Sequence, residues 1–165
     1  MKLTLSILIL LLICTACEKD ELVVDRDTTH QLVPNTTIHY ATTYYDSTAT
    51  YVTFSREFSR DSFLLEARRY VDPLPQAVDD ESTNVLTIPL ARDIQSFTYT
   101  DEELVENGVF LNYEDCFCAR FTPYPVIGTI SGTQNSDGSW TVSGYVSPVE
   151  DFDGVNNWNV TGIYR

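Results

Sequence analysis

The sequence predicts an all-β protein, an antiparallel β-sandwich of about 8–10 short strands with one short helix near residues 101–107. Apolar and polar residues alternate with a period of two over most of the segment 36–164, which is the pattern of strands that bury one face. Turn-forming residues separate these segments, and no helical pattern alternates with them as a parallel sheet would require. Hydrophobic residues make up 43% of the 165 residues, which is enough for a packed core.

The first part of the chain is expected to hold several separate strands. The first covers 36–45, where Ile38, Tyr40 and Tyr44 alternate with polar residues. Further strands are expected at 48–54, 62–68, 86–90 and 96–100. Proline lacks the N–H group that a central strand needs, so Pro89 predicts that the strand at 86–90 lies at an edge of its sheet.

The clearest strand pattern lies near the C-terminus. Trp140, Val142 and Val146 alternate with serine and threonine, and they are expected to face the core. The turn residues at 135–138, Asn-Ser-Asp-Gly, come directly before this strand. They predict a hairpin whose partner strand is 126–132. The last strand is expected at 158–164.

A single short helix is expected after the strand at 96–100. Thr100 and Glu103 have the spacing of a capping box, in which Thr100 is the N-cap and the Glu103 side chain reaches back to it. Asn107 and Gly108 are residues that end a helix. The predicted helix therefore has barely two turns.

A two-sheet sandwich and a closed barrel of the lipocalin type both fit the expected number of strands. The strands are short and uneven, and the long acidic segment 72–84 is suited to a crossover between two sheets. These features favour the sandwich, with the barrel as the alternative.

The charge of the chain excludes some partners. It has 10 Lys and Arg against 24 Asp and Glu, a formal net charge of −14 at pH 7. Nucleic acids and anionic lipid surfaces need a basic face, which this composition does not supply. No nucleic-acid partner is therefore expected.

Residues 1–16 have the pattern of a signal peptide. Lys2 precedes an apolar run from Leu3 to Ile13, whose 11 residues are fewer than the about 20 that span a bilayer. The next residues, 14–17 (Cys-Thr-Ala-Cys), resemble the lipobox of bacterial lipoproteins, with a cysteine where leucine is usual. The resemblance implies cleavage before Cys17 and attachment of fatty acid such as palmitate to it, with no other cofactor. Ordinary signal peptidase would leave the same N-terminus without lipid.

The segment that follows Cys17 predicts where the protein is displayed. Residues 18–21, Glu-Lys-Asp-Glu, are similar to the acidic tag that directs lipoproteins of some Gram-negative bacteria to the exterior face of the outer membrane. An ordinary solvated tether is the alternative. Residues 17–34 lack strand and helix periodicity and are expected to form a flexible acidic tether, followed by one all-β domain at 35–165. The lipid alone would then contact the membrane.

Cys116 and Cys118 are the only thiols left once Cys17 is acylated. On a strand they would point to the same side, and an exported protein meets oxidising conditions. A disulfide between them is the favoured interpretation, and two inert thiols are the alternative. A metal or redox role is disfavoured, because only His30 and His39 could add soft ligands and both lie far away in the sequence.

The segment 151–157 is a candidate calcium site. Asp151, Asp153 and Asn156 place oxygen ligands around a glycine, which resembles part of a calcium-binding loop. The complete spacing and the terminal bidentate glutamate are missing. A polar turn between strands explains the same residues.

Two short triplets are candidate O-glycosylation sites. Asp27-Thr28-Thr29 and Asp46-Ser47-Thr48 resemble the acceptor triplet of exported proteins in some bacteria. Thr28 and Ser47 would carry the glycan, since both fall in a predicted tether or turn. Chance occurrence is the alternative in a chain so rich in Asp, Ser and Thr.

No sequence motif of a known catalytic site is present, so the chain is expected not to be an enzyme. The sequence favours a surface- or periplasm-exposed lipoprotein that acts as a binding or assembly module for a protein or glycan partner. One alternative is a lipocalin-like carrier of a small apolar ligand, which requires a closed barrel with an unfilled interior. The other is a glycan-directed hydrolase, which requires two convergent carboxylates in a cleft.

Overall fold

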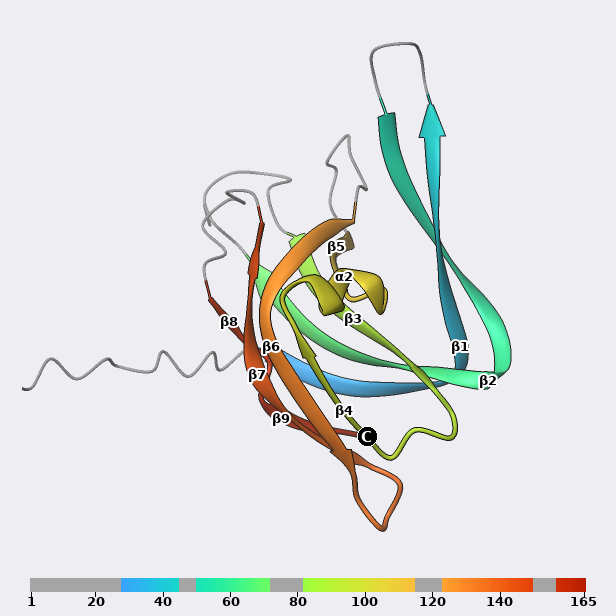
Figure 1. Cartoon of the computed structure of the whole chain (residues 1–165), viewed down its shortest axis with the longest axis vertical. Helices are drawn as coiled ribbons and strands as arrows, with labels where there is room; N and C mark the ends of the chain where they lie inside the picture. The colour runs from blue at the N-terminus through green and yellow to red at the C-terminus, as the bar shows by residue number, and fades with distance from the viewer. Residues whose placement is uncertain (1–27, 45–49, 72–81, 115–122, 150–156) are drawn as a thin grey trace, which may run out of the picture.

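The computed structural model describes residues 28–44, 50–71, 82–114, 123–149 and 157–165. Within them the chain forms one open antiparallel sheet of nine strands and one short helix (Figure 1). The predicted all-β antiparallel class is therefore confirmed, and the closed-barrel alternative is wrong. The elements are β1 (Thr28–Tyr44), β2 (Thr50–Val71), β3 (Ser82–Ala91), β4 (Ser96–Thr100), α2 (Glu102–Glu106), β5 (Phe110–Glu114), β6 (Tyr124–Gln134), β7 (Trp140–Pro148), β8 (Trp158–Asn159) and β9 (Gly162–Tyr164).

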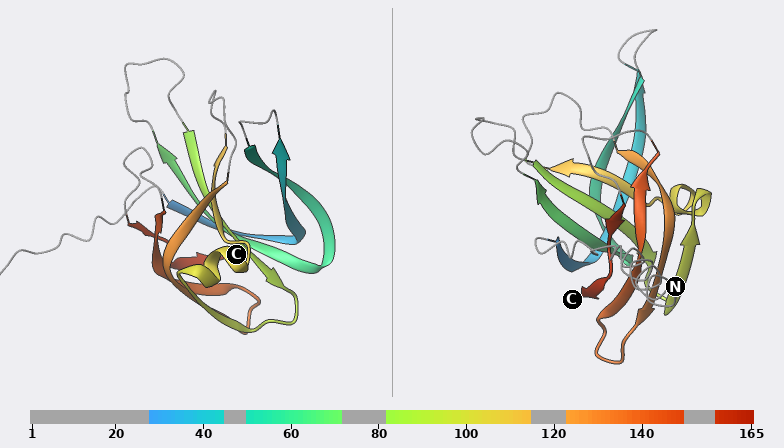
Figure 2. Two further views of the ribbon diagram at one scale, coloured as in Figure 1. Left: turned by 45° about the horizontal axis from the view of Figure 1, so that its top comes forward. Right: turned by 90° about the vertical axis from the view of Figure 1, so that its left-hand side faces the viewer.

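The sheet folds over into two leaves at β6. The strand order is β1-β2-β3-β5-β6-β7-β8, while β4 also pairs with β6 and β9 also pairs with β7. Because β5 pairs with 124–125 of β6 and β4 pairs with 129–133, β6 belongs to both leaves. The first leaf is β1-β2-β3-β5, and the second is β4-β6-β7-β8-β9 (Figure 2).

The core lies between the two leaves. The Trp140 ring of the second leaf lies 5.7 Å from the ring of Phe63 in the first leaf and 5.8 Å from that of Phe97, measured between centroids. Trp140, Trp158 and Tyr164 are among the largest fully buried side chains. The remaining core comes mainly from β2, β3, β6 and β7, including Leu65, Leu86, Ile88, Ile130, Val142 and Val146. Side chains therefore fill the space between the leaves.

The C-terminal hairpin forms as the sequence predicts. β6 and β7 pair from Val126 with Pro148 to Gln134 with Trp140. In the turn, the Asp137 Oδ1 atom accepts a hydrogen bond of 3.0 Å from the Ser139 N–H, and Gly138 has a φ of 85°. The expected inward side chains are buried, with exposed fractions of 0% or 2%.

The helix α2 keeps half of the predicted capping box. The Glu103 carboxylate accepts hydrogen bonds of 3.0 Å from both the N–H and the hydroxyl of Thr100. The N-cap, however, is Asp101, and no side chain caps the helix N–H groups. Asn107 is the C-cap and Gly108 follows with a φ of 73°, so the predicted stop is confirmed.

Strands β1 and β2 are longer than the sequence indicates. β2 runs without a break through both strands expected at 48–54 and 62–68. β1 begins at Thr28, within the segment 17–34 for which the sequence predicts a tether. The residues 28–34 show no apolar alternation because partly buried polar side chains lie on both sides of this part of β1. Leu32 packs against the core, and Gln31 donates a hydrogen bond of 2.9 Å to the buried Glu66 on the opposite side.

Pro89 does not mark an edge strand, since β3 lies between β2 and β5. β5 pairs only with 83–87 of β3, so Pro89 lies beyond the last paired residue of that neighbour. Its missing N–H therefore breaks no pairing with β5. The prediction of an edge strand is therefore wrong, although Pro89 itself has no partner on the β5 side, as a residue without an N–H requires.

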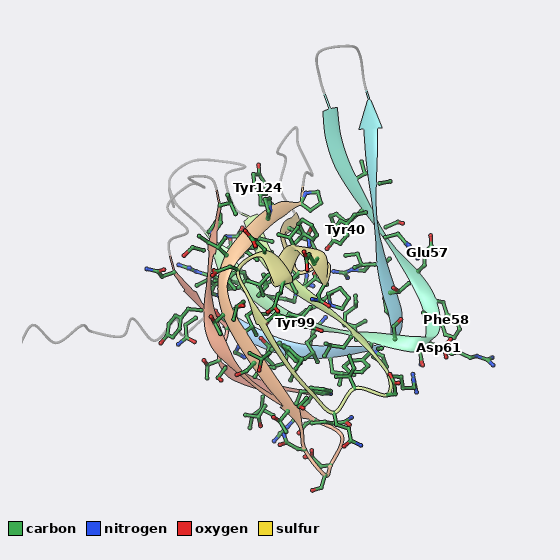
Figure 3. All side chains as sticks on the ribbon, viewed as in Figure 1. Tyr40, Glu57, Phe58, Asp61, Tyr99 and Tyr124 are labelled. Atoms are coloured by element: carbon green, nitrogen blue, oxygen red, sulfur yellow. The ribbon has the colours of Figure 1, made fainter. Side chains whose placement is uncertain are left out.

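The far ends of β1 and β2 form an arm, defined here as residues 36–44 and 50–58. The ribbon bends at Asn35, whose φ is 52°, and the pairing register shifts between Pro34 and Thr36 (Figure 1). The arm then lies over the outer face of the first leaf. Tyr40 points from the arm toward the body, and its ring centroid lies 4.5 Å from that of Phe110 in β5 (Figure 3).

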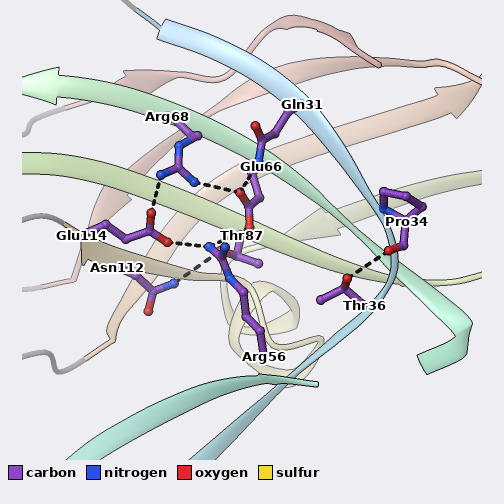
Figure 4. A network of polar contacts seen from close by, with 9 residues as sticks. All are labelled: Gln31, Pro34, Thr36, Arg56, Glu66, Arg68, Thr87, Asn112 and Glu114. Carbon is purple, nitrogen blue, oxygen red and sulfur yellow. Dashed lines mark hydrogen bonds and ion pairs between the residues drawn. The ribbon is translucent and has the colours of Figure 1, made fainter. Parts of the chain in front are cut away.

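A network of ionic side chains lies between the arm and the first leaf (Figure 4). Glu66 is completely buried and contacts two arginines: its Oε1 is 2.9 Å from Arg56 Nη2, and its Oε2 is 3.1 Å from Arg68 Nη1. Glu114 of β5 pairs with both arginines. The two positive and two negative charges balance. Burial raises the pKa of the nearby Tyr40 hydroxyl to about 12.

The start of β1 meets the C-terminal strand β9. The Leu32 N–H donates a hydrogen bond of 2.8 Å to the Arg165 carbonyl, and the His30 ring packs edge-on against Tyr164 with centroids 4.8 Å apart. The His30 Nε2 atom is buried and has no hydrogen-bond partner among the described residues. A positive charge on this imidazole would therefore be poorly solvated at the contact between β1 and β9.

The fold is expected to lose stability as the pH falls below the ordinary His30 pKa of 6.5. Burial lowers the pKa of His30 in the folded chain, so the unfolded chain binds the proton at a higher pH. The stability present above pH 6.5 is then lost as the pH falls through the lowered pKa of the folded state. Urea unfolding at about pH 7.5 and about pH 5.5 would measure this loss. In His30→Gln the loss should shrink, and an unchanged loss would contradict the role of His30.

Candidate functional site

The outer side of the second leaf is a face built mainly of serine and threonine side chains, which we call the hydroxyl face. Alternate residues of each strand point outward, so the exposed positions of β4, β6, β7 and the C-terminal segment share this side. The hydroxyl face consists of Ser96, Thr98, Thr100, Ile127, Thr129, Ser131, Thr133, Thr141, Ser143, Tyr145, Ser147, Asn159, Thr161 and Ile163.

The strand register arranges these side chains in rows across the leaf. One row joins Thr98, Ser131 and Ser143. The next row joins Thr129 to Tyr145, with Thr100 on one side and Asn159 on the other. Side chains that lie opposite each other on adjacent strands are close neighbours, so a ligand on this face meets several strands at once.

The hydroxyl face carries no Asp, Glu, Lys or Arg, although these residues make up 21% of the chain. Charged side chains among the described residues lie at its borders: Asp101 precedes α2, Glu103 accepts the hydrogen bond of the Thr100 hydroxyl, and Arg165 follows β9. The outward strand positions that the structure describes on this leaf are thus uncharged, although the chain has a net charge of −14. Solubility alone does not require an uncharged polar surface, because charged side chains are solvated equally well.

The hydroxyl face is hollowed by a groove of about 570 Å³ along β6 and β7. Ile127 and Tyr145, which are 45% and 46% exposed, provide its apolar surface. Asp101 and Asn157 add an acid and an amide to its lining. The groove is therefore amphipathic, with hydroxyl groups beside a partly exposed aromatic ring.

Two glycines of the groove lining allow the backbones of β6 and β7 to approach each other closely. Gly128 and Gly144 have φ values of 132° and 151°, which side chains rarely adopt. A Cβ atom on Gly128 would lie 2.2 Å from the Tyr145 carbonyl oxygen, and one on Gly144 would lie 2.1 Å from that of Thr129. The sequence indicates that Gly144 shares the inward side of β7, but it does not indicate this packing.

Hydrogen bonds within the groove hold its polar groups in place. Asp101 exchanges two hydrogen bonds with Gly128, donating its N–H to the carbonyl at 2.8 Å and accepting the glycine N–H on Oδ1 at 3.1 Å. Ser131 and Ser143 share a hydrogen bond of 3.2 Å, and Ser147 bonds to the Asn157 Oδ1 at 2.9 Å. A hydroxyl has one donor and two acceptor positions, so each of these serines can still bind a ligand.

The sequence-predicted site residues lie mostly outside the described parts of the chain. This holds for the lipid site, the cysteine pair, the calcium candidate and one glycosylation candidate, namely Cys17, Cys116, Cys118, Asp151, Asp153, Asn156 and Ser47. In the ranges that are described, no three His, Cys, Asp or Glu side chains come together in a way that could hold a metal ion.

Thr28 is the one described glycosylation candidate, and its setting differs from the expected tether. It is the first residue of β1, and its Oγ1 atom accepts a hydrogen bond of 3.3 Å from the Trp158 Nε1 atom. A glycan on this hydroxyl would have to displace that contact. Glycosylation at Thr28 stays a prediction, and the hydroxyl in question already accepts the Trp158 hydrogen bond.

Sequence reasoning missed the hydroxyl face as a site. The signal was present at the outward positions of 96–100, 126–132 and 139–147, which are serine, threonine and a few apolar residues without a charge. Only the strand register shows that these separate segments form one continuous surface.

The fold and the groove together define an open antiparallel β-sandwich with a polar outer groove. No protein-family model matches the chain, and no curated protein and no solved structure is significantly similar to it. Among the described residues, no helix has the length and apolar character needed to cross a membrane.

Proposed function

We propose that this chain is a lipid-anchored, non-enzymatic binding module displayed on the bacterial outer membrane, which binds an extracellular glycan through the hydroxyl face. The observation that carries the proposal is that the outward strand positions described on this face are uncharged in a chain with net charge −14. Hydroxyl groups held on rigid strands, beside an exposed tyrosine, suit a ligand that is itself rich in hydroxyl groups.

A binding role without catalysis is supported by the lining of the groove. Its described residues include one carboxylate, Asp101, whose Oδ1 already accepts the Gly128 N–H. Glycoside hydrolysis usually uses a pair of carboxylates on either side of the bond that is cleaved. The carrier alternative is less well supported still, because the sheet is open and aromatic side chains fill the space between its leaves.

The anchor in this proposal is the lipid predicted on Cys17. The negative charge of the chain opposes contact with anionic headgroups, so the acyl chains would hold the protein while the domain stands away from the membrane. The acidic segment after Cys17 then leads into β1 at Thr28.

The proposal is tested by expressing the full-length chain in a Gram-negative host. Cells are labelled with an alkyne analogue of palmitate, and their retention on immobilised neutral and acidic polysaccharides is measured. The wild-type chain should take up the label and retain the cells on at least one glycan. Cys17→Ser should lose both properties, because the anchor is absent.

Thr129→Asp separates binding from anchoring, because it places a carboxylate in the groove while leaving Cys17 intact. It should keep the palmitate label and lower cell retention by at least about tenfold, which is a loss of about 1.4 kcal/mol in binding. Ser55→Asp, on the exposed side of the arm, is the matched control and should behave as wild type. Equal retention by Thr129→Asp and wild type would overturn the assignment of the face.

A further inference from the structure

We infer that the ligand of the hydroxyl face is an uncharged polysaccharide, bound in the groove with a sugar ring against Tyr145. This inference rests on the proposed function and adds the chemical class of the ligand. Its evidence is the charge, the hydrogen-bonding groups and the exposed ring of the groove.

The charges of the groove exclude an acidic polysaccharide. Uronates, sialates and sulfated sugars need arginine or lysine to balance them, and neither is among the described residues that line the groove. The net charge of −14 repels a polyanion before it reaches the surface. Asp101 adds a further negative charge at the groove itself.

A cationic ligand is also a poor match. Asp101 is the single acid among the described residues of the lining, and one of its oxygens is taken by the Gly128 N–H. Glu103, at the border of the hydroxyl face, already accepts the hydrogen bonds of Thr100, and no other acid of the described residues lines the groove. A ligand that is selected by this groove is therefore neutral.

The hydrogen-bonding groups of the groove match a sugar. Ser131 and Ser143 bond to each other, and Ser147 bonds to Asn157, so these side chains are held in position before a ligand arrives. Each of these hydroxyls keeps an acceptor position, and one of Ser131 and Ser143 also keeps its O–H, so together they can both accept from and donate to sugar hydroxyls. Groups held in place in this way reduce the entropy that binding costs.

Tyr145 supplies the apolar part of such a site. It is 46% exposed and lies between Thr129 and Asn159 in its row. The C–H groups on one side of a pyranose ring form a flat apolar surface, which packs on an aromatic ring while the sugar hydroxyls bond to the strands on either side. Tyrosine suits this position because it combines a large apolar ring with a polar end.

The composition of the face favours a glycan over a protein partner. The energetically important residues of protein interfaces are mostly Trp, Tyr and Arg, while Ser and Thr are under-represented. Of the hydroxyl face, only Tyr145 belongs to the favoured set, and serine and threonine dominate. A protein partner would therefore find few anchoring side chains here.

The inference is tested by electrophoresis of the purified mature chain through gels that contain polysaccharide. The gels hold a neutral glucan, mannan or xylan, or else pectate, alginate or chondroitin sulfate. Retardation is expected in at least one neutral gel and in none of the acidic gels. It should be unchanged between about 0.05 M and about 0.5 M salt, because no ion pair contributes.

Tyr145→Ala should weaken the retardation in the neutral gel by about tenfold, because the stacking surface is lost. Phe58→Ala is the matched control, since Phe58 is 74% exposed and lies on the arm, outside the groove. A circular dichroism spectrum of each variant confirms that it is folded.

The outcomes separate this inference from the proposed function. Binding to acidic gels alone would overturn the inference and leave a glycan-binding module. Neutral binding that Tyr145→Ala does not change would overturn the placement of the sugar. Retardation in none of the gels would contradict both the inference and the proposed function.

Discussion

Replacing Trp140 with alanine is expected to destabilise the fold by about 4 kcal/mol. Trp140 is completely buried, and its ring contacts Phe97 in its own leaf and Phe63 in the other. Its removal leaves a cavity at the place where the two leaves meet, and the β-strand framework cannot collapse to fill it. A loss of this size is a large part of the stability of a typical domain.

Trp140→Phe is the matched control for this prediction. It keeps a ring between Phe63 and Phe97, and it removes the Trp140 Nε1 group, which has no hydrogen-bond partner among the described residues. Loss of this unpaired donor offsets part of the lost packing, so a cost of about 1 kcal/mol is expected. Urea unfolding measures both values. A Trp140→Ala variant no less stable than Trp140→Phe would contradict the packing of the two leaves.

Glu66→Gln is expected to cost about 3 kcal/mol of stability, because it removes one charge from a buried ionic network. In the wild type each guanidinium has a Glu66 oxygen as acceptor. In the variant the amide presents an N–H₂ group to either Arg56 or Arg68 in place of that oxygen. The side chains of these arginines are 34% and 23% exposed, so water relieves part of the cost. For that reason the expected value is at the lower end of what loss of a buried partner costs.

Glu57→Gln separates this effect from a general change in charge. Glu57 lies on the arm, its side chain is 60% exposed, and its carboxylate is 3.5 Å from His39 (Figure 3). An exposed substitution of this kind should change the free energy of unfolding by no more than about 0.5 kcal/mol. Equal urea midpoints for Glu66→Gln and Glu57→Gln would show that the network does not hold the arm to the first leaf.

The sequence predicts local structure well where neighbouring residues decide it. The hairpin at 135–138, the inward side of β7 and the stop of α2 depend on turn residues and on a period of two, which are visible over a few positions. It fails where the cause is distant. Residues 28–34 belong to β1 because they pair with 63–69 of β2, where Gln31 also donates to Glu66, 35 residues further along the chain.

The candidate site divides in the same way. The sequence places serine and threonine on the outward side of each strand, but it does not show that β4, β6 and β7 lie side by side. Gly128 and Gly144 carry no sign in the sequence that a Cβ atom would meet the neighbouring backbone. Register between strands sets both features, and register is a property of the whole sheet.

The sequence by itself determined the all-β class, the acidic charge and the uncharged outward positions, because composition and period follow from the order of residues. Tertiary structure alone decided that the sheet is open, that the arm folds back over Glu66, and that the outward hydroxyls surround one groove. These three depend on contacts between strands that are distant in the chain. These contacts are stabilised by burial of apolar surface and by strand pairing across the folded chain. A short segment of sequence contains neither.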